Sequence, residues 1–127
     1  MTLTASAQPR RILIVEDEFL IALTAEEALM AEGFEVVGVA ATFDQAVSIA
    51  ERELPDLVLM DIRLASARDG VEAAIEIRRR FGLASLFTSA NQDPENIARA
   101  RTAGPAGWLP KPYTIERLVE AVRAFFG

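Results

Sequence analysis

Short apolar runs alternate with segments of helical pattern along this chain, and this order restricts the fold more than any other feature. The runs are short and continuous, which is typical of strands buried on both faces; they cover residues 12–15, 36–39, 56–61, 86–87 and 107–109. Strand–helix alternation implies parallel strands, right-handed crossovers and helices on both faces. The sequence therefore predicts an α/β fold, a doubly wound five-stranded parallel sheet.

Local signals mark the ends of the helices between these strands. Two segments have the signature of a capping box, in which a side chain accepts a backbone N–H and the residue three positions later reaches back: Thr42–Gln45 and Asp69–Glu72. Asp93-Pro94 and Thr114 are predicted to open the last two helices. The predicted helix stops are Gly33, Gly82 and Gly104.

The composition excludes several kinds of chemistry. The 127 residues include no cysteine and no histidine, which excludes disulfides, zinc–thiolate sites, imidazole catalysis and a role as a phosphohistidine carrier. The net charge of −6 disfavours direct nucleic-acid binding, since such surfaces are normally basic. The chain has no apolar stretch long enough for a membrane span, so we expect no membrane partner and a cytoplasmic location. We expect residues 1–10 to be a flexible lead-in and residues 11–127 to form one domain.

Polar side chains gather where the predicted strands end. Glu16 and Asp17 follow the first strand and Asp61 ends the third, while Ser89 and Lys111 close the fourth and fifth. Ligands of such sheets bind beyond the carboxyl ends of the strands. We therefore expect these residues to share one pocket.

The three acids in this group favour a divalent cation. Neighbouring carboxylates repel one another unless a cation neutralises them, and oxygen ligands without histidine or cysteine suit Mg2+ or Mn2+ better than zinc. Asp61 then has the chemistry to attack a phosphoryl group. Lys111 can pair with Asp61 at rest and with phosphate afterwards; the isomer of its bond to Pro112 is left open. Thr88 and Ser89 point to opposite sides of the strand, and we expect Ser89 to face the pocket.

These residues lie in segments that resemble the receiver domain of bacterial two-component response regulators. The matching segments are Ile12–Glu18, Leu57–Leu64, Ser89-Ala90 and Gly107–Tyr113, and the resemblance extends over residues 11–126. All four motifs, taken together in this order, are highly specific for this family. The resemblance implies a flavodoxin-like (βα)5 receiver fold with strand order 2-1-3-4-5.

The resemblance also implies roles for the acids. Asp61 matches the aspartate that accepts phosphate from a sensor histidine kinase or a histidine phosphotransfer protein. Asp17 matches a direct metal ligand and Glu16 a ligand that acts through water. The backbone carbonyl of Arg63 would complete the metal site together with Asp61.

Other matching positions imply how the signal leaves the site. Lys111 matches the phosphate-pairing lysine, Ser89 the switch hydroxyl, and Trp108 the switch aromatic. Signalling, including phosphorylation-dependent pairing of two copies, would use a surface made by three segments: Asp93–Ala103, Gly107–Leu109 and Thr114–Phe126.

Some positions depart from the family pattern. Leu64-Ala65 replaces the common Met-Pro, and the loop Ala65–Asp69 is one residue longer than the commonest form. Trp108 replaces the usual Tyr or Phe. Pro110 removes an N–H, which is tolerable on an edge strand.

We therefore predict a single-domain response regulator with no output domain in cis, which assists only its own phosphorylation and is not a turnover enzyme. One alternative is a metal-dependent phosphohydrolase with Asp61 as nucleophile, although Arg63 stands where a second acid would be expected. Another is a degenerate receiver that binds partners without phosphate. The intact acids, Ser89 and Lys111 argue against it.

Overall fold

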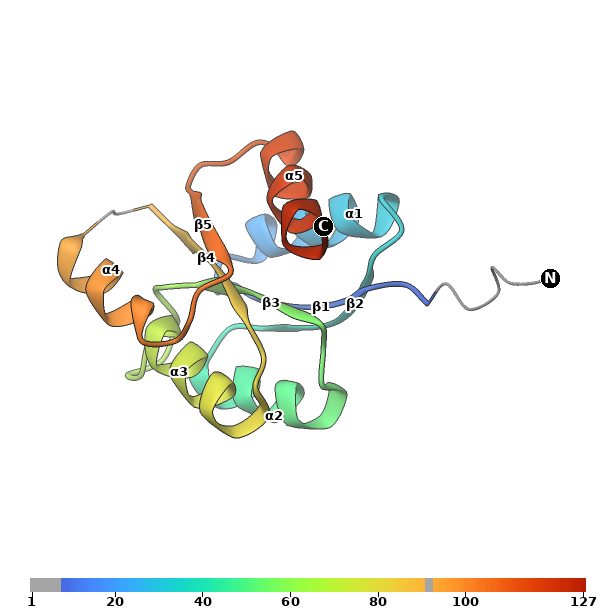
Figure 1. Ribbon diagram of the computed structural model, residues 1–127. Helices are drawn as coiled ribbons and strands as arrows, with labels where there is room; N and C mark the ends of the chain where they lie inside the picture. Colours follow the sequence, from blue (N-terminus) through green and yellow to red (C-terminus); the bar gives the residue numbers. More distant parts are fainter. Residues whose placement is uncertain (1–7, 91–92) are drawn as a thin grey trace.

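A computed structural model of the chain describes residues 8–90 and 93–127, and within these ranges strands and helices alternate strictly (Figure 1). The strands are β1 (Arg11–Val15), β2 (Glu35–Ala40), β3 (Leu57–Asp61), β4 (Ser85–Ser89) and β5 (Gly107–Pro110). The helices are α1 (Phe19–Ala31), α2 (Phe43–Glu53), α3 (Gly70–Phe81), α4 (Pro94–Arg101) and α5 (Ile115–Phe126). Of the expected lead-in, residues 1–7 lie outside the described residues, and residues 8–10 have no regular secondary structure.

The strands form one parallel sheet in the order β2-β1-β3-β4-β5, which confirms the predicted fold class and strand order. The pairing places Val15 beside Met60 and Asp61 beside Thr88, so the carboxyl ends of the three central strands meet at one edge of the sheet. β5 is an edge strand, and Pro110 stands at its end beside Ser89, a position where a proline without an N–H is tolerated.

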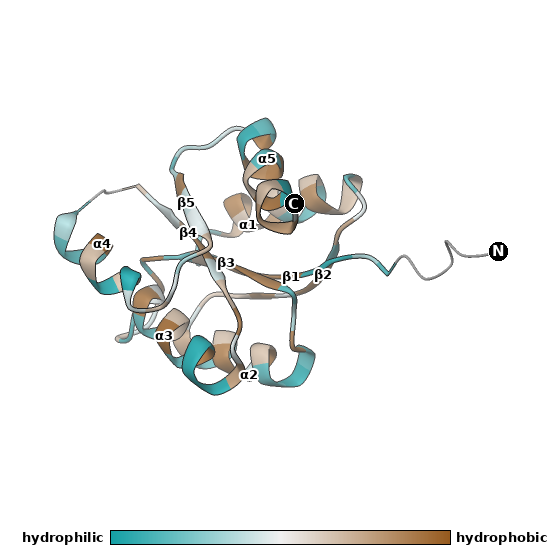
Figure 2. Ribbon diagram, in the orientation of Figure 1, coloured by the Kyte–Doolittle hydropathy of each residue, from teal (hydrophilic) through white to brown (hydrophobic). Residues whose placement is uncertain are grey.

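Side-chain alternation divides the core into two layers. Ile12 and Ile14 pack toward α1 and α5, whereas Leu13 and Val15 pack toward α2 and α3. Figure 1 shows α1 and α5 on one face of the sheet and α2, α3 and α4 on the other. Figure 2 shows apolar residues concentrated along the central strands and the inward faces of the helices. The two cores hold the strand ends, and therefore the polar residues on them, in fixed positions.

The helix signals in the sequence are confirmed at most positions. Asp69 and Glu72 form a capping box, and the side chains of Thr42, Asp93 and Thr114 each cap a helix. Gln45 reaches back one residue beyond its cap and accepts the N–H of Ala41 at 2.8 Å.

The predicted stop of α4 at Gly104 is wrong, because the helix ends at Arg101. The Thr102 hydroxyl donates to the carbonyl of Arg99 at 2.7 Å, and the N–H groups of residues 102, 103 and 104 bond to carbonyls three residues back. These shorter bonds replace the α-helical pattern. Gly104 follows with a positive φ of 62°. None of the helices in the described ranges has the length and apolar character needed to cross a membrane.

Candidate functional site

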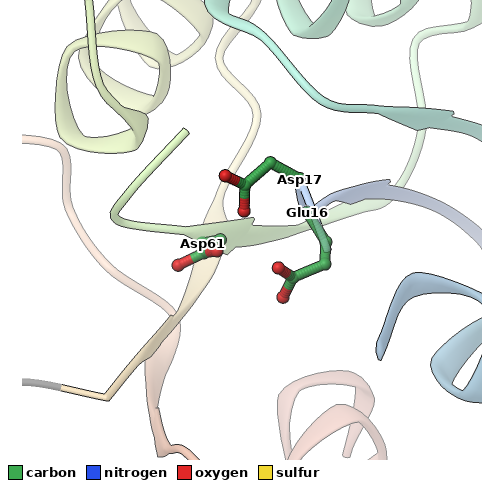
Figure 3. Close-up of side chains that lie close together, drawn as sticks. All are labelled: Glu16, Asp17 and Asp61. Carbon is green, nitrogen blue, oxygen red and sulfur yellow. The ribbon is translucent and has the colours of Figure 1, made fainter. Parts of the chain in front are cut away.

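Three carboxylates meet at the carboxyl edge of the sheet. Glu16 and Asp17 directly follow β1, and Asp61 is the last residue of β3. One oxygen from each residue lies within 4.8 Å of the others, and Figure 3 shows the three carboxylates around a common space. Glu16 and Asp61 are only 5% and 4% exposed, whereas Asp17 faces solvent. The predicted acidic cluster therefore forms, with two members buried and one accessible.

Lys111 bridges the two buried acids. Its ammonium lies 2.7 Å from Glu16 Oε1 and 3.0 Å from Asp61 Oδ2. The backbone brings it there because Lys111 follows edge strand β5, and its N–H donates to the carbonyl of Ser89 at 2.9 Å. Burial acts to lower the pKa of Lys111, but its hydrogen bonds to Glu16 and Asp61 outweigh this effect and raise the pKa. The lysine is therefore a cation held in place by both carboxylates. Its bond to Pro112 is cis.

Glu16 has the most perturbed carboxyl group at the site. Burial raises its pKa to about 7, and the nearby charge of Asp61 acts in the same direction, while the hydrogen bond from Lys111 works against both. Glu16 Oε2 also accepts the N–H of Glu18 at 3.1 Å. A single ammonium thus does not fully compensate for the burial of these acids.

The predicted residues Arg63 and Ser89 line an acidic hollow of about 300 Å3 together with three of the charged residues described above. Its lining residues are Asp17, Glu18, Asp61, Arg63, Ser89, Ala90 and Lys111. Ser89 faces this space as expected. Arg63 donates its backbone N–H to Asp61 Oδ1 at 3.2 Å, which fixes the other oxygen of that carboxylate.

Trp108 lies outside the acidic hollow. It is half-buried on β5, and its ring stacks on that of Phe87, with centroids 5.3 Å apart and an interplanar angle of 26°. Phe87 is fully buried and two residues before Ser89. Trp108 is therefore connected to the site through the packing of β4.

Gly70 is a position that sequence reasoning treated only as part of a helix start. A β-carbon on Gly70 would lie 2.8 Å from the carbonyl carbon of Asp61, closer still to the carbonyl oxygen, and 3.1 Å from Cα of Ile62. The N–H of Gly70 donates to the carbonyl of Ile62 at 2.8 Å. The first turn of α3 therefore rests directly on the backbone that presents Asp61, and only glycine permits that distance.

A second, more apolar hollow of about 430 Å3 adjoins the site. It is lined by Glu18, Leu20, Ile21, Thr24, Ala90, Lys111, Pro112 and Tyr113. Burial raises the pKa of Tyr113 to about 12. Sequence reasoning missed this hollow, because it forms only where the start of α1 meets the connection from β5 to α5.

The donor set fits a hard divalent cation. The acidic cluster offers only oxygen ligands, two of them buried and one open to solvent. Mg2+ typically combines one or two carboxylates with several waters in an octahedral shell. Glu16, Asp17 and Asp61 are therefore suitable ligands for Mg2+ or Mn2+, and zinc would find neither of its preferred soft ligands.

Comparison with known proteins agrees with this architecture. The sequence profile described as "Response regulator receiver domain" matches residues 12–123. The transcriptional regulatory protein PdtaR of Mycobacterium tuberculosis is 41% identical over 117 residues, which cover 92% of this chain and 57% of PdtaR. The chemotaxis protein CheY of Bacillus subtilis is 34% identical over 113 residues, 88% of this chain and 93% of CheY.

Solved structures show the same likeness. The signal receiver domain of a modulated diguanylate cyclase from Desulfovibrio desulfuricans G20 superposes with a TM-score of 0.85 at 35% identity, covering 92% of this chain and 93% of that domain. A CheY-like receiver domain protein from Methanospirillum hungatei JF-1 also superposes with a TM-score of 0.85, at 28% identity, covering 92% of this chain and 93% of that chain. The chain spans little more than half the length of PdtaR.

Proposed function

This chain belongs to the response regulator receiver domain family, and on that premise we propose that Asp61 accepts a phosphoryl group from a histidine kinase or a histidine phosphotransfer protein. Receiver domains are signalling modules that bind Mg2+ at an acidic pocket and interact with such donors. The modified chain would then act through protein–protein contacts. The single observation that carries the proposal is the buried Asp61 carboxylate, which lies 3.0 Å from the Lys111 ammonium at the edge of an open acidic hollow.

In the proposed reaction, a carboxylate oxygen of Asp61 attacks phosphorus. A P–O bond to Asp61 forms while the P–N bond of the donor phosphohistidine breaks, and its electron pair returns to the imidazole. Mg2+ or Mn2+ held by Glu16, Asp17, Asp61 and the Arg63 carbonyl would supply positive charge against the phosphoryl oxygens. Lys111 would exchange its contact with Asp61 for one with a phosphoryl oxygen. The chain contributes mainly position and charge, as is usual in phosphoryl transfer.

Ser89 and Trp108 would convert this modification into a change of surface. We propose that the Ser89 hydroxyl donates to a phosphoryl oxygen, and that Trp108 moves into the space that Ser89 leaves. The stacking of Trp108 on Phe87 supports this proposal, because it connects the tryptophan to the strand that ends at Ser89. Trp108 is the single tryptophan of the chain, so its fluorescence reports on this step. Unchanged fluorescence on full phosphorylation would count against it.

The decisive experiment is to incubate the protein with Mg2+ and acetyl phosphate and to weigh it by intact mass spectrometry. We expect one added phosphoryl group, which disappears in Asp61→Asn and when the metal is chelated. Asp56→Asn is the matched control, because Asp56 stands before β3 at the opposite edge of the sheet and bonds to the N–H of Arg11. If the wild-type protein binds Mg2+ but gains no mass, a phosphate-independent binding module replaces the proposal.

A further inference from the structure

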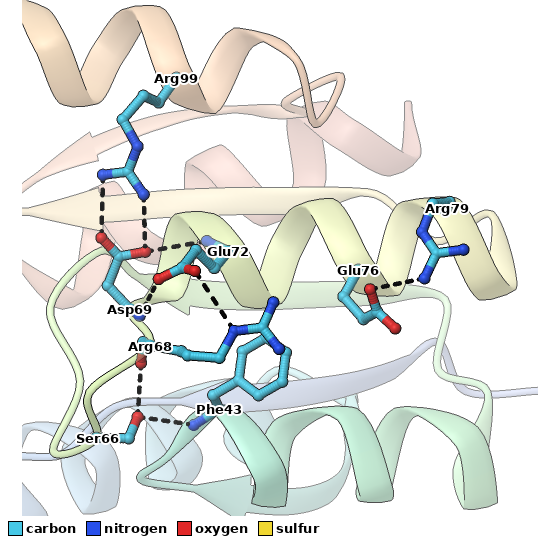
Figure 4. Close-up of polar contacts among 8 residues, drawn as sticks. All are labelled: Phe43, Ser66, Arg68, Asp69, Glu72, Glu76, Arg79 and Arg99. Atoms are coloured by element: carbon cyan, nitrogen blue, oxygen red, sulfur yellow. Dashed lines mark hydrogen bonds and ion pairs between the residues drawn. The ribbon is translucent and has the colours of Figure 1, made fainter.

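The connection between β3 and α3, residues 62–69, carries a polar network that joins it to α4 (Figure 4). Asp69 is at its centre. Both of its carboxylate oxygens accept from the guanidinium of Arg99, at 3.1 Å and 3.2 Å. The same carboxylate accepts the backbone N–H of Glu72 at 3.0 Å and so caps α3. One side chain therefore sets the start of α3 and binds α4.

The other side of this connection is bound to α2. The Ser66 hydroxyl accepts the N–H of Phe43 at 3.0 Å and donates to the carbonyl of Arg68 at 2.6 Å. The guanidinium of Arg68 lies 3.8 Å above the ring of Phe43, and its Nε is 3.4 Å from Glu72. With Ser66 and Arg68 holding one side, a displacement of α4 acts on the connection mainly through Asp69.

Asp69 is also next to the residue that touches the site. Gly70 packs against the backbone of Asp61 and donates to the carbonyl of Ile62. A continuous path of contacts therefore runs from α4 through Arg99, Asp69 and Gly70 to the backbone of Asp61. The other end of α4 starts at Pro94, shortly after β4 ends at Ser89.

We propose that the Asp69–Arg99 pair is a latch that holds α4 in its resting position, so that Arg99 is a positioning residue for phosphorylation of Asp61. The inference rests on the proposed function and adds a means of regulation to it. A bidentate arginine–carboxylate pair has a fixed fork geometry, so a shift of α4 that follows Ser89 toward the phosphoryl group breaks it. Because an interaction lost in one state favours the other state, removal of the latch favours the phosphorylated arrangement.

The test uses variants that separate the latch from the helix cap. Asp69→Asn removes the charge that binds Arg99 but keeps an equally good capping residue. Arg99→Met removes the latch from the α4 side, Arg99→Lys keeps the charge without the fork, and Asp69→Asn/Arg99→Met completes a double-mutant cycle. Arg79→Met is the matched control, because Arg79 pairs with Glu76 at 2.8 Å farther along α3 and away from α4 (Figure 4).

Phosphorylation rates with acetyl phosphate are measured at saturating Mg2+, together with Trp108 fluorescence before phosphorylation and urea unfolding. We expect Asp69→Asn and Arg99→Met each to accelerate phosphorylation by about two- to fivefold, the effect that a partly exposed ion pair can supply. Their resting fluorescence should shift toward the phosphorylated value. The double variant should be no faster than the faster single variant, Arg99→Lys should be intermediate, and Arg79→Met should match the wild type.

Unchanged or slower phosphorylation in Arg99→Met, or additive effects in the double variant, would overturn the latch. Lower stability with wild-type rates and fluorescence would show that the pair is only structural, and this too refutes the inference. Failure of the proposed function has a different result, since the wild-type protein would then gain no phosphoryl group. The two failures are therefore distinguishable in the same set of measurements.

Discussion

Substitution of Gly70 by alanine tests whether the packing of α3 on β3 positions the phosphoacceptor. The added methyl group would lie 2.8 Å from the carbonyl carbon of Asp61 and 3.1 Å from Cα of Ile62. Carbon atoms in contact prefer about 3.5–4.0 Å. These two atoms, and the still closer carbonyl oxygen of Asp61, belong to the backbone and cannot rotate away, so the helix and the strand must separate by more than about 1 Å to restore ordinary contact distances.

The expected loss of stability combines two costs and one offset. Forcing a methyl group into a packed region costs about 1–3 kcal/mol, and weakening the 2.8 Å bond from Gly70 N–H to the Ile62 carbonyl adds about 0.5–1.5 kcal/mol. Restriction of the unfolded chain by alanine offsets about 0.4–1 kcal/mol. We therefore expect Gly70→Ala to lower the free energy of unfolding by roughly 0.5–4 kcal/mol.

The assay is urea unfolding of the metal-free protein, followed by the rate of phosphorylation by acetyl phosphate at saturating Mg2+. A displacement of about 1 Å in a reacting group can reduce a rate by up to about 100-fold, so we expect at least a roughly tenfold loss in the folded variant. Gly107→Ala is the control. Its β-carbon would lie 3.1 Å from Cδ1 of Leu86, the end of a side chain that can move, and its stability should remain within about 1 kcal/mol of wild type.

A Gly70→Ala variant that unfolds at the same urea concentration as Gly107→Ala and is phosphorylated at the wild-type rate would refute this role for Gly70. That result would mean that α3 shifts freely over the end of β3. A loss of stability with an unchanged rate would also be informative, because it would separate the packing of α3 from the position of the Asp61 carboxylate. Only a combined loss of stability and rate would show that the packing of α3 on β3 positions Asp61.

Two further predictions concern the charges at the site. Lys111→Met removes the cation that lies 2.7 Å from Glu16 and 3.0 Å from Asp61; calorimetry should show Mg2+ binding tightened by roughly three- to tenfold, while phosphorylation slows by at least about tenfold. The pKa of Glu16 is raised from 4.5 to about 7, so the folded state holds a proton that the unfolded state releases. The stability of the metal-free protein should therefore fall between pH 5 and pH 8, by on the order of 1–3 kcal/mol, as measured by urea unfolding in EDTA. Glu16→Gln should remove this fall; a wild-type protein that is equally stable at both pH values would refute the assignment.

Most of the fold is readable from the sequence because local signals agree with the global order. Continuous apolar runs identify strands buried on both faces, and the caps at Thr42, Asp69 and Thr114 fix helix starts through bonds within a few residues. The end of α4 was not predictable in the same way. There the Thr102 hydroxyl donates to the carbonyl of Arg99 and competes with the helical hydrogen bond. The position of a glycine in the sequence does not reveal this competition.

The candidate site also has features that were predictable from the sequence and features that were not. Glu16, Asp61 and Lys111 were predictable because parallel strands bring their carboxyl ends together. The contact of Gly70 with Asp61 and the pairing of Asp69 with Arg99 depend on how helices lie on the sheet. A glycine immediately after a capping aspartate is the one sequence signal that points to such a close approach.

The balance of charge at the strand ends predicts that the proposed phosphorylation of Asp61 needs a divalent cation. Two buried carboxylates already share the single ammonium of Lys111, and Asp17 adds a third negative charge. A phosphoryl group on Asp61 carries roughly −1.5 to −2 charges, and these take the place of the single negative charge of the Asp61 carboxylate. If Lys111 moves to the phosphoryl oxygens, Glu16 loses its ion-pair partner while it remains buried. A cation bound by Glu16 and Asp17 removes this conflict, since it frees Lys111 to follow the phosphoryl group without leaving an uncompensated buried charge.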